Sequence, residues 1–391
     1  MVDVAEIQHQ LKNERLDGWL FFDHHQRDPL AHRILKLRPG AMATRRWYYF
    51  IPAEGEPKRL VHRIESGMLD ELPGPKTVYS GWGTQVGGIQ EILGGAKRIA
   101  MQYSPNCAIP LVSMVDGGTV ELVRSTGVEV VSSANLIQIF EARWTAEQRD
   151  MHFEAGRRVD SIRAQAFDLI RAHQKADRKI TEWDVNRFIR KAFNEDGLVT
   201  DHGPIVAVNA NMSNPHYEPL PDACSEIRKG DAVLIDMWAK LDRPGAVFYD
   251  ITWTGFCGGI IPEKINNVFE IVRDGRDGAI ERVKSAVAAH KPLCGYEVDD
   301  AARGHITDKG FGEFFVHRTG HSIGEDVHGT GANMDNLETH DERLVIAGTC
   351  FSIEPGVYLP EFGIRSEVNM YIGEDAAEVT GEIQTEMVRI A

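Results

Sequence analysis

Four carboxylates stand out because each interrupts a strand-like run of apolar residues. Asp236 and Asp250 lie in AVLIDMWA and VFYDITWTGF, and Glu354 and Glu367 lie in TCFSIEPGVYL and FGIRSEVNMYI. The two acids of each pair flank a stretch with turn residues, so antiparallel strands would bring them to neighbouring positions on one face. An unpaired carboxylate buried in such a run is costly. The sequence therefore predicts positive charge at this place.

The positive charge could come from side chains or from metal ions. A single buried acid most often pairs with Arg or Lys, but the four segments supply one nearby cation, Arg365, which shares a face with Glu367 by strand alternation. Four converging acids would repel one another, and two divalent cations would neutralise them with the oxygen-rich coordination that Mn, Mg or Co prefers. We therefore expect a dinuclear carboxylate site.

Four histidines lie in loops that would meet the same strands. His317, His321 and His328 occur within FFVHRTGHSIGEDVHG, and His216 occurs within SNPHYEP. A lone loop histidine is usually a solvated surface residue, whereas three within twelve positions between acid-bearing strands indicate a site. One imidazole would complete the metal coordination, and the others could hydrogen-bond a substrate carbonyl or stabilise a tetrahedral intermediate.

These residues all follow a predicted domain boundary. Residues 1–144 begin with a helix and alternate Gly-rich breaks such as GGIQEILGG with short β-rich runs, which predicts a small α/β domain. The runs are GWLFF, RRWYYFI, KRLVHRI, RIAMQY and VEVVSS. Thr145 and Gln148 form a capping box that opens a long helix and a second domain, 145–391. Further helices are expected at 181–197, 262–290 and 298–309. With the β-rich segments, EFFVH included, they predict two weakly similar halves, each of two helices followed by a hairpin.

Composition excludes several classes of protein. The net charge of −15, without a run of Lys or Arg, opposes nucleic-acid binding and favours small-molecule or peptide chemistry. Five widely spaced cysteines without a CxxC pair indicate neither a disulfide framework nor a thiolate zinc site. The charged N-terminus lacks the apolar core of a signal peptide, and no later stretch approaches the roughly 20 apolar residues of a membrane span. We expect a cytoplasmic protein without a membrane anchor.

The motifs LID, YDIT, HRTGHSIG.DVHG, FSIEPGVY and FGIRSE, in this order, resemble the pita-bread metallopeptidases. That family includes prolidase (Xaa-Pro dipeptidase), aminopeptidase P, methionine aminopeptidase and the metal-free creatinases. The resemblance extends over about residues 145–375, and the preceding domain looks like the creatinase-type N-terminal domain. It implies an α+β architecture, with a pita-bread catalytic domain after a smaller α/β domain. We expect a homodimer, the commonest closed assembly.

The resemblance also implies a ligand set for two divalent metal ions per subunit. Asp250 and Glu367 look like the carboxylates that bridge both metals. Asp236 would bind one metal, and His321 with Glu354 would bind the other. Manganese is the expected metal, with cobalt or zinc as alternatives.

Further roles follow from the same comparison of motifs. His216, His317 and His328 resemble the histidines around the substrate. Glu354 resembles the acid that moves a proton from the attacking water to the leaving nitrogen, and Arg365 resembles the basic residue that supports the glutamate beside it.

The sequence departs from the family pattern beside the second aspartate. Where the family usually has Gly-Tyr, this chain has Ala246 and Val247. The family's DITRT is DITWT in this chain, so that Trp253 takes the place of an arginine. Trp253 would lie on the strand face opposite Asp250, which favours a core or interface aromatic over a catalytic role.

The implied reaction is hydrolysis of Xaa-Pro dipeptides, in which a metal-bridging hydroxide attacks the peptide carbonyl. The alternatives are an aminopeptidase P acting on longer peptides, a creatinase-like hydrolase and a non-catalytic pita-bread binding protein. The intact ligand set disfavours the last two.

A dipeptidase must recognise the free carboxylate that follows proline. The segment LETHDERLVIAG offers His340 and Arg343 for this role. Arg343 is favoured because a planar guanidinium can hold a carboxylate with two hydrogen bonds. A solvated surface position for Arg343 is an equal alternative.

Overall fold

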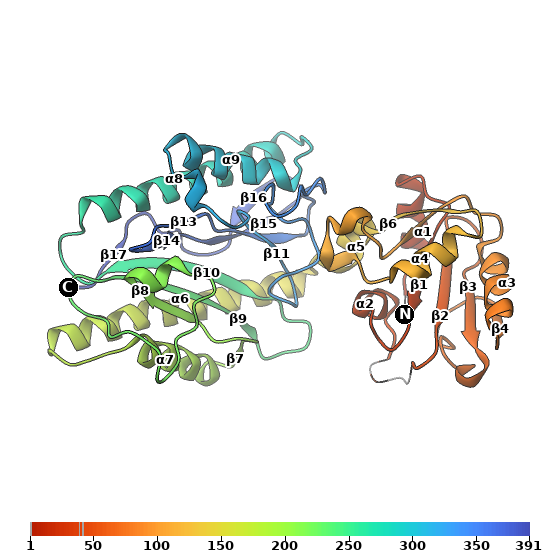
Figure 1. The fold of residues 1–391 in the computed structure, drawn as a ribbon, viewed down its shortest axis with the longest axis horizontal. Coiled ribbons are helices and arrows are strands. Elements are labelled where there is room, and N and C mark those ends of the chain that lie inside the picture. Colours follow the sequence, from red (N-terminus) through yellow and green to blue (C-terminus); the bar gives the residue numbers. More distant parts are fainter. Residues whose placement is uncertain (1, 39, 41–42) are drawn as a thin grey trace. The chain divides into compact units, whose positions relative to one another are not determined.

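The computed structural model describes residues 2–38, 40 and 43–391, and the chain forms two compact units (Figure 1). The division falls between Glu141 and Ala142, three residues before the expected boundary. Trp144 explains the difference. Its backbone N–H donates to Gly348 at 2.7 Å and its indole N–H donates to the carbonyl of Ile323 at 3.1 Å, so this segment already packs within the second unit.

The first unit is a mixed sheet with helices, in the strand order β4-β3-β2-β1-β5-β6. The strands are β1 (Gly18–Asp23), β2 (Trp47–Pro52), β3 (Lys58–His62), β4 (Lys76–Tyr79), β5 (Arg98–Met101) and β6 (Glu129–Ser132). The helices are α1 (Val4–Asn13), α2 (Pro29–Leu35), α3 (Trp82–Leu93), α4 (Gly117–Arg124) and α5 (Ala134–Ile137). Alternate residues of β1 enter two apolar clusters, Trp19 and Phe21 in one, Leu20 and Phe22 in the other. The sheet therefore has a core on each face.

Two details of this unit differ from the sequence-based expectations. GGIQEILGG is not a break, because most of it lies in α3. Gly88 has a packing role, since a Cβ there would come within 2.5 Å of Leu60 Cδ1. The short strand β4 was also missed.

The second unit contains the expected helices α6 (Ala146–Lys175), α7 (Glu182–Glu195), α8 (Glu263–Ala288) and α9 (Gly295–Asp308). The capping box of Thr145 and Gln148 begins α6 as predicted. EFFVH was wrongly expected to be a strand, since its first residues belong to a short 3₁₀ helix, Gly312–Phe314. Arg303 in α9 holds this segment by donating to the carbonyls of Phe315 and His317.

The strands of this unit lie between the two helix pairs (Figure 1). β9 (Ala232–Leu241) and β10 (Tyr249–Phe256) form a long hairpin, joined by β7 (Leu198–Val199), β8 (Ile205–Val208) and β17 (Val388–Arg389). The second sheet has the order β11-β12-β15-β16, with β11 (Ser322–Ile323), β12 (Cys350–Ile353), β15 (Val368–Ile372) and β16 (Ala377–Val379). A separate pair is β13 (Gly356–Tyr358) with β14 (Gly363–Arg365).

All five cysteines are unpaired. Within the described ranges, no helix combines the length and apolarity needed to cross a membrane.

Candidate metal centre

The β9–β10 hairpin brings the first two acids to one face. In the antiparallel register Asp236 lies opposite Thr252, and Asp250 lies two residues from Thr252 on the same strand. Because side chains two apart on a strand share a face, Asp236 and Asp250 are diagonal neighbours. Both are buried. This placement confirms the prediction from the turn residues between them.

The second two acids lie where one strand pair ends and another begins. β12 and β15 end their pairing at Ile353 and Val368, and β13 and β14 begin at Gly356 and Arg365. Glu354 and Glu367 fall between these points and continue the same register, opposite each other. The expected single hairpin is thus two short pairs with a break at the acids.

Hydrogen bonds join this break to β10. The Glu367 amide donates to the carbonyl of Thr252 at 3.1 Å, and the Thr252 hydroxyl donates to Glu367 Oε2 at 2.7 Å. The Asn369 side chain accepts from the Asp250 amide at 2.9 Å and donates to the Asp250 carbonyl. The Glu354 amide donates to the carbonyl of Thr319 at 2.7 Å. These bonds hold the two sheets in register around the acids.

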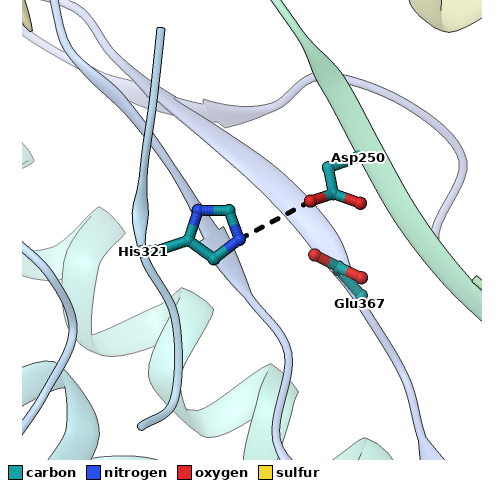
Figure 2. A group of neighbouring side chains, drawn as sticks. All are labelled: Asp250, His321 and Glu367. Carbon is teal, nitrogen blue, oxygen red and sulfur yellow. Dashed lines mark ion pairs between the residues drawn. The ribbon is translucent and has the colours of Figure 1, made fainter. Parts of the chain in front are cut away.

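His321 points its free nitrogen at the acids (Figure 2). Its Nδ1 lies 3.1 Å from the carbonyl of Ser322, an acceptor, so Nδ1 carries the hydrogen in the neutral ring and Nε2 is then a lone-pair donor. Nε2 lies 3.5 Å from Asp250 Oδ2 and 3.4 Å from Glu354 Oε1. Ligand atoms of His321, Asp250 and Glu367 all lie within 4.8 Å of one another. This is the tautomer that a metal-binding histidine requires.

The acids lie too close together to ionise independently. Burial, together with the charges of neighbouring Asp250 and Glu354, raises the pKa of Asp236 to about 7 despite Arg365. Burial also raises the pKa of Asp250, and it raises that of Glu367 far above its usual range. For Glu354, burial is outweighed by the charges of His321 and other groups, so its pKa lies below its usual range. The cluster as a whole lacks compensating positive charge.

Arg365 supplies part of that charge in a different way from the expectation. Its guanidinium pairs with Asp236, and its Nε donates to the Thr252 hydroxyl at 3.0 Å. It reaches Glu367, the glutamate that it was expected to support, through Thr252. Its Nη1 also donates to the Tyr358 hydroxyl at 3.1 Å.

The residues present fit divalent metal ions. Among the residues that the structure describes, Asp250 Oδ1 is a buried oxygen without a hydrogen-bond partner. An orphaned carboxylate oxygen facing other acids is costly unless a cation is added. Carboxylate oxygens with one imidazole nitrogen form a donor set suited to Mn, Co or Zn.

The remaining histidines have different environments. His317 Nδ1 lies 2.7 Å from the Arg318 carbonyl and its Nε2 lies 2.7 Å from the Tyr358 hydroxyl, so both nitrogens are engaged. Burial lowers the pKa of His317 to about 4. The ring of His328 lies 4.3 Å from that of His321, whose charge, with burial, lowers the pKa of His328 to about 3. Exposed His216 lies near enough for its charge to act on His328.

Arg343 and His340 are occupied by other partners. Arg343 is buried. Its Nε and Nη2 donate to Asp341 at 2.9 and 2.6 Å, and its Nη1 donates to the Thr330 carbonyl at 2.7 Å. The surface position is therefore wrong, and the free guanidinium that a carboxylate clamp needs is absent. Exposed His340 has its Nδ1 2.7 Å from Asn336 Oδ1.

Sequence reasoning missed Arg318, which follows His317 directly. Its charge acts on both Glu354 and His328, so it lies within electrostatic range of the cluster. It forms a long ion pair, 3.9 Å, with half-exposed Glu338. Its position within HRTGH was the available signal. The sequence gives no comparable signal for Thr252, Tyr358 and Asn369, because their roles depend on contacts made in the folded structure.

Trp253 has the core role predicted for it. It packs against the apolar cluster under β9 and β10, and the Arg163 guanidinium lies 3.5 Å above its ring centre.

Comparison with known proteins adds a family match and similar folds. The family model described as Metallopeptidase family M24 matches residues 151–374. The chain is 30% identical over 214 residues to an Xaa-Pro dipeptidase of Lactobacillus helveticus. The matched residues make up 54% of this chain and 52% of that protein. The chain thus spans about half the length of the curated relatives that it matches.

Solved structures resemble nearly the whole chain. The dipeptidase PepE of Mycobacterium ulcerans has a TM-score of 0.71 at 22% identity, covering 99% of this chain and 96% of that one. An X-Pro aminopeptidase of Thermotoga maritima has a TM-score of 0.59 at 18% identity, covering 96% and 99%. These similarities confirm the expected fold class.

Proposed function

Because this chain belongs to metallopeptidase family M24 and keeps every residue expected to bind the metal ions, we propose that it hydrolyses the peptide bond of Xaa-Pro dipeptides. One observation supports this most strongly. The residues expected to bind the metals gather in one buried cluster that needs positive charge. They are Asp236, Asp250, His321, Glu354 and Glu367.

The bound ions would balance the acids and polarise the scissile carbonyl. The chain's own residues handle the proton. Glu354 is ionised at neutral pH because its pKa is lowered, so it can accept a proton from the attacking water. Returning that proton to the proline nitrogen releases the product, since this nitrogen has no hydrogen of its own in the peptide.

The histidines at the edge of the cluster would orient the substrate. Neutral His328 can donate an N–H to the substrate carbonyl, where negative charge develops. His216 lies close enough to assist it. His317 acts indirectly, because its Nε2 holds the Tyr358 hydroxyl, which in turn accepts a hydrogen bond from Arg365.

We assign recognition of the free carboxylate after proline to Arg318 in place of Arg343. Its charge reaches Glu354 and His328, and its one ion pair in the described part of the chain is long. A substrate carboxylate can therefore displace Glu338 at small cost. A longer peptide would place an uncharged amide there, which disfavours it.

The test compares alanyl-proline with alanyl-prolyl-alanine. The protein is stripped with chelator, reloaded with Mn, Co or Zn, and assayed on both peptides. We expect efficient cleavage of the dipeptide alone, with Arg318→Ala raising its KM at least tenfold, about 1.4 kcal/mol. Arg228→Ala is the control, since Arg228 is an exposed arginine paired with Glu226. Comparable turnover of both peptides would make aminopeptidase P the better description.

The identity of the metal, the assembly and the compartment belong to the same proposal. We propose manganese, a homodimer and the cytoplasm. The oxygen-rich ligands support manganese, and the five unpaired cysteines support the cytoplasm. Metal analysis of protein purified without chelator, sedimentation velocity and cell fractionation test these three points.

A further inference from the structure

The first unit contains a cavity of about 750 Å³. β1 and β2 pair so that Asp23 lies opposite Trp47, which brings the residues after β1 and those before β2 to one edge of the sheet. Those residues line the cavity, together with the starts of α3 and α4. The volume lies in the range of small-molecule sites.

The cavity is lined by more positive than negative side chains. Arg27, Arg45 and Arg46 are among the lining residues, and in the described ranges none of them forms an ion pair with a carboxylate; the Arg45 guanidinium donates to the carbonyl and hydroxyl of Thr44 at 3.2 and 3.0 Å. Asp116 is the acid among the lining residues. Its oxygens accept from the Thr119 amide at 2.9 Å and the Thr119 hydroxyl at 2.7 Å. Among the lining residues, arginines therefore outnumber acids, in a chain of net charge −15.

The backbone that carries these arginines is held in place. The Arg27 amide donates to buried Asp23 at 2.7 Å, and the Arg45 amide donates to Glu65 at 3.0 Å. Between Asp23 and Arg27, His25 has a φ of 64°, a left-handed conformation that is costly outside glycine. The carboxyl of Asp23 stabilises this turn. The backbone of Arg27 and of Arg45 is therefore fixed, which lowers part of the entropy cost of binding a ligand.

The positive groups act on one another. His24, on the cavity wall, has a lowered pKa because of burial and then because of the charges of His25, Arg27 and Arg46, which outweigh the opposing charge of Asp23. These groups therefore lie close enough to repel. A bound anion would relieve that repulsion.

We propose that this cavity binds a small organic phosphate whose planar ring packs on Trp82. Guanidinium groups recognise phosphate oxygens with paired hydrogen bonds, and three of them suit a dianion better than a single carboxylate. Trp82 lies at the cavity with 84% of its surface exposed, so it offers a flat apolar face. The site is distinct from the metal centre, which lies wholly in the second unit.

Calorimetric titration of the metal-loaded protein tests the proposal, with adenosine monophosphate, adenosine and inorganic phosphate as probes. We expect adenosine monophosphate to bind in the micromolar range, at least tenfold tighter than either fragment. Arg27→Ala and Arg46→Ala should weaken it at least tenfold and leave dipeptide hydrolysis in its absence unchanged. Arg46→Lys, which keeps the charge, should lose less. Arg15→Ala is the matched control, because Arg15 is an exposed arginine of the same unit outside the cavity.

The outcomes separate the alternatives. Undiminished binding by well-folded Arg27→Ala and Arg46→Ala proteins would place the anion elsewhere, for example at the metals, and would overturn the proposal. No binding to the unaltered protein at millimolar concentration would do the same. Equal affinity for inorganic phosphate and adenosine monophosphate would overturn the role of Trp82. Thermal melting of each variant checks that it is folded.

Discussion

The carboxylates of the metal centre differ in how many other acids they face, and this leads to different expectations for their replacement. Asp250 and Glu367 have ligand atoms within 4.8 Å of each other and of His321, whereas Asp236 is paired with Arg365. If Asp250 and Glu367 bridge two ions, Asp250→Ala and Glu367→Ala should lose both, and Asp236→Ala should retain one. Metal analysis after gel filtration measures this. Equal losses from all three variants would contradict the bridging assignment.

The histidines should separate metal binding from rate. His321→Ala should reduce metal content, because its Nε2 faces Asp250 and Glu354. His328→Ala and His216→Ala should keep the metals and lower kcat by about 10- to 100-fold, the usual range for an outer group that aids proton transfer or oxyanion stabilisation. Metal content and kcat are measured on the same samples. The assignment of the imidazoles is wrong if His328→Ala empties the site and His321→Ala does not.

For single residues, the sequence predicted the acid cluster because buried charges in strand-like runs are costly. It could not predict that Arg365 pairs with Asp236, because that contact depends on how β14 crosses β9. Arg343 shows the opposite failure. Its residue type suited a carboxylate clamp, but Asp341, two residues earlier, already binds its guanidinium.

The loop that carries His216 depends on one buried residue of α7. Glu182 accepts from the Val208 amide at 2.8 Å, the Tyr217 hydroxyl at 2.7 Å and the Ser225 amide at 2.6 Å. Its carboxylate therefore ties both ends of the loop to the start of the helix.

Glu182→Gln should loosen this loop, because the amide NH₂ would oppose donors, at a cost of roughly 1–3 kcal/mol. We expect faster proteolytic cleavage within 209–225 and a lower kcat/KM, with metal content unchanged. The control is Glu195→Gln, since Glu195 lies at the other end of α7 and pairs with exposed Lys191 at 3.5 Å. Unaltered cleavage and kcat/KM would show that Glu182 does not order the loop.

The sequence predicted the helices of the second unit well, because capping boxes and apolar periodicity are local signals. It misread GGIQEILGG because its glycines suggest a break, whereas Gly88 serves close packing against Leu60. It also missed the break between β12 and β13. Such a change of partner strand depends on β10, more than a hundred residues earlier.

At the scale of the whole molecule, His152 makes the free energy of unfolding depend on pH. It is fully buried in the second unit, with Nδ1 2.7 Å from the Phe248 carbonyl and Nε2 2.7 Å from the Thr380 hydroxyl. Burial lowers its pKa from 6.5 to about 4. As the pH falls from 6.5 to 4, the unfolded chain binds a proton here that the folded chain excludes, so stability falls.

His152→Gln tests this, because glutamine can donate and accept without titrating. The unfolding free energy of the native protein relative to the variant should shrink by about 3 kcal/mol between pH 7 and pH 4, at 1.36 kcal/mol per pKa unit. Urea unfolding at several pH values measures it, and exposed His290→Gln serves as the control. Parallel curves for native protein and His152→Gln would contradict the linkage.

The two-unit organisation followed from composition and turn signals, but the cavity of the first unit did not. Arg27 and Arg46 are far apart in sequence, and only the pairing of β1 with β2 brings them together.

The break between β12 and β13 has a consequence for amide hydrogen exchange. The Glu354 amide donates to the carbonyl of Thr319, in the loop between His317 and His321. The Glu367 amide donates to the carbonyl of Thr252, in β10. Neither amide can exchange with deuterated water until its partner segment moves away. Because the acids, the loop and β10 share one hydrogen-bonded cluster, both amides should become deuterated at nearly the same slow rate, reporting a single opening event.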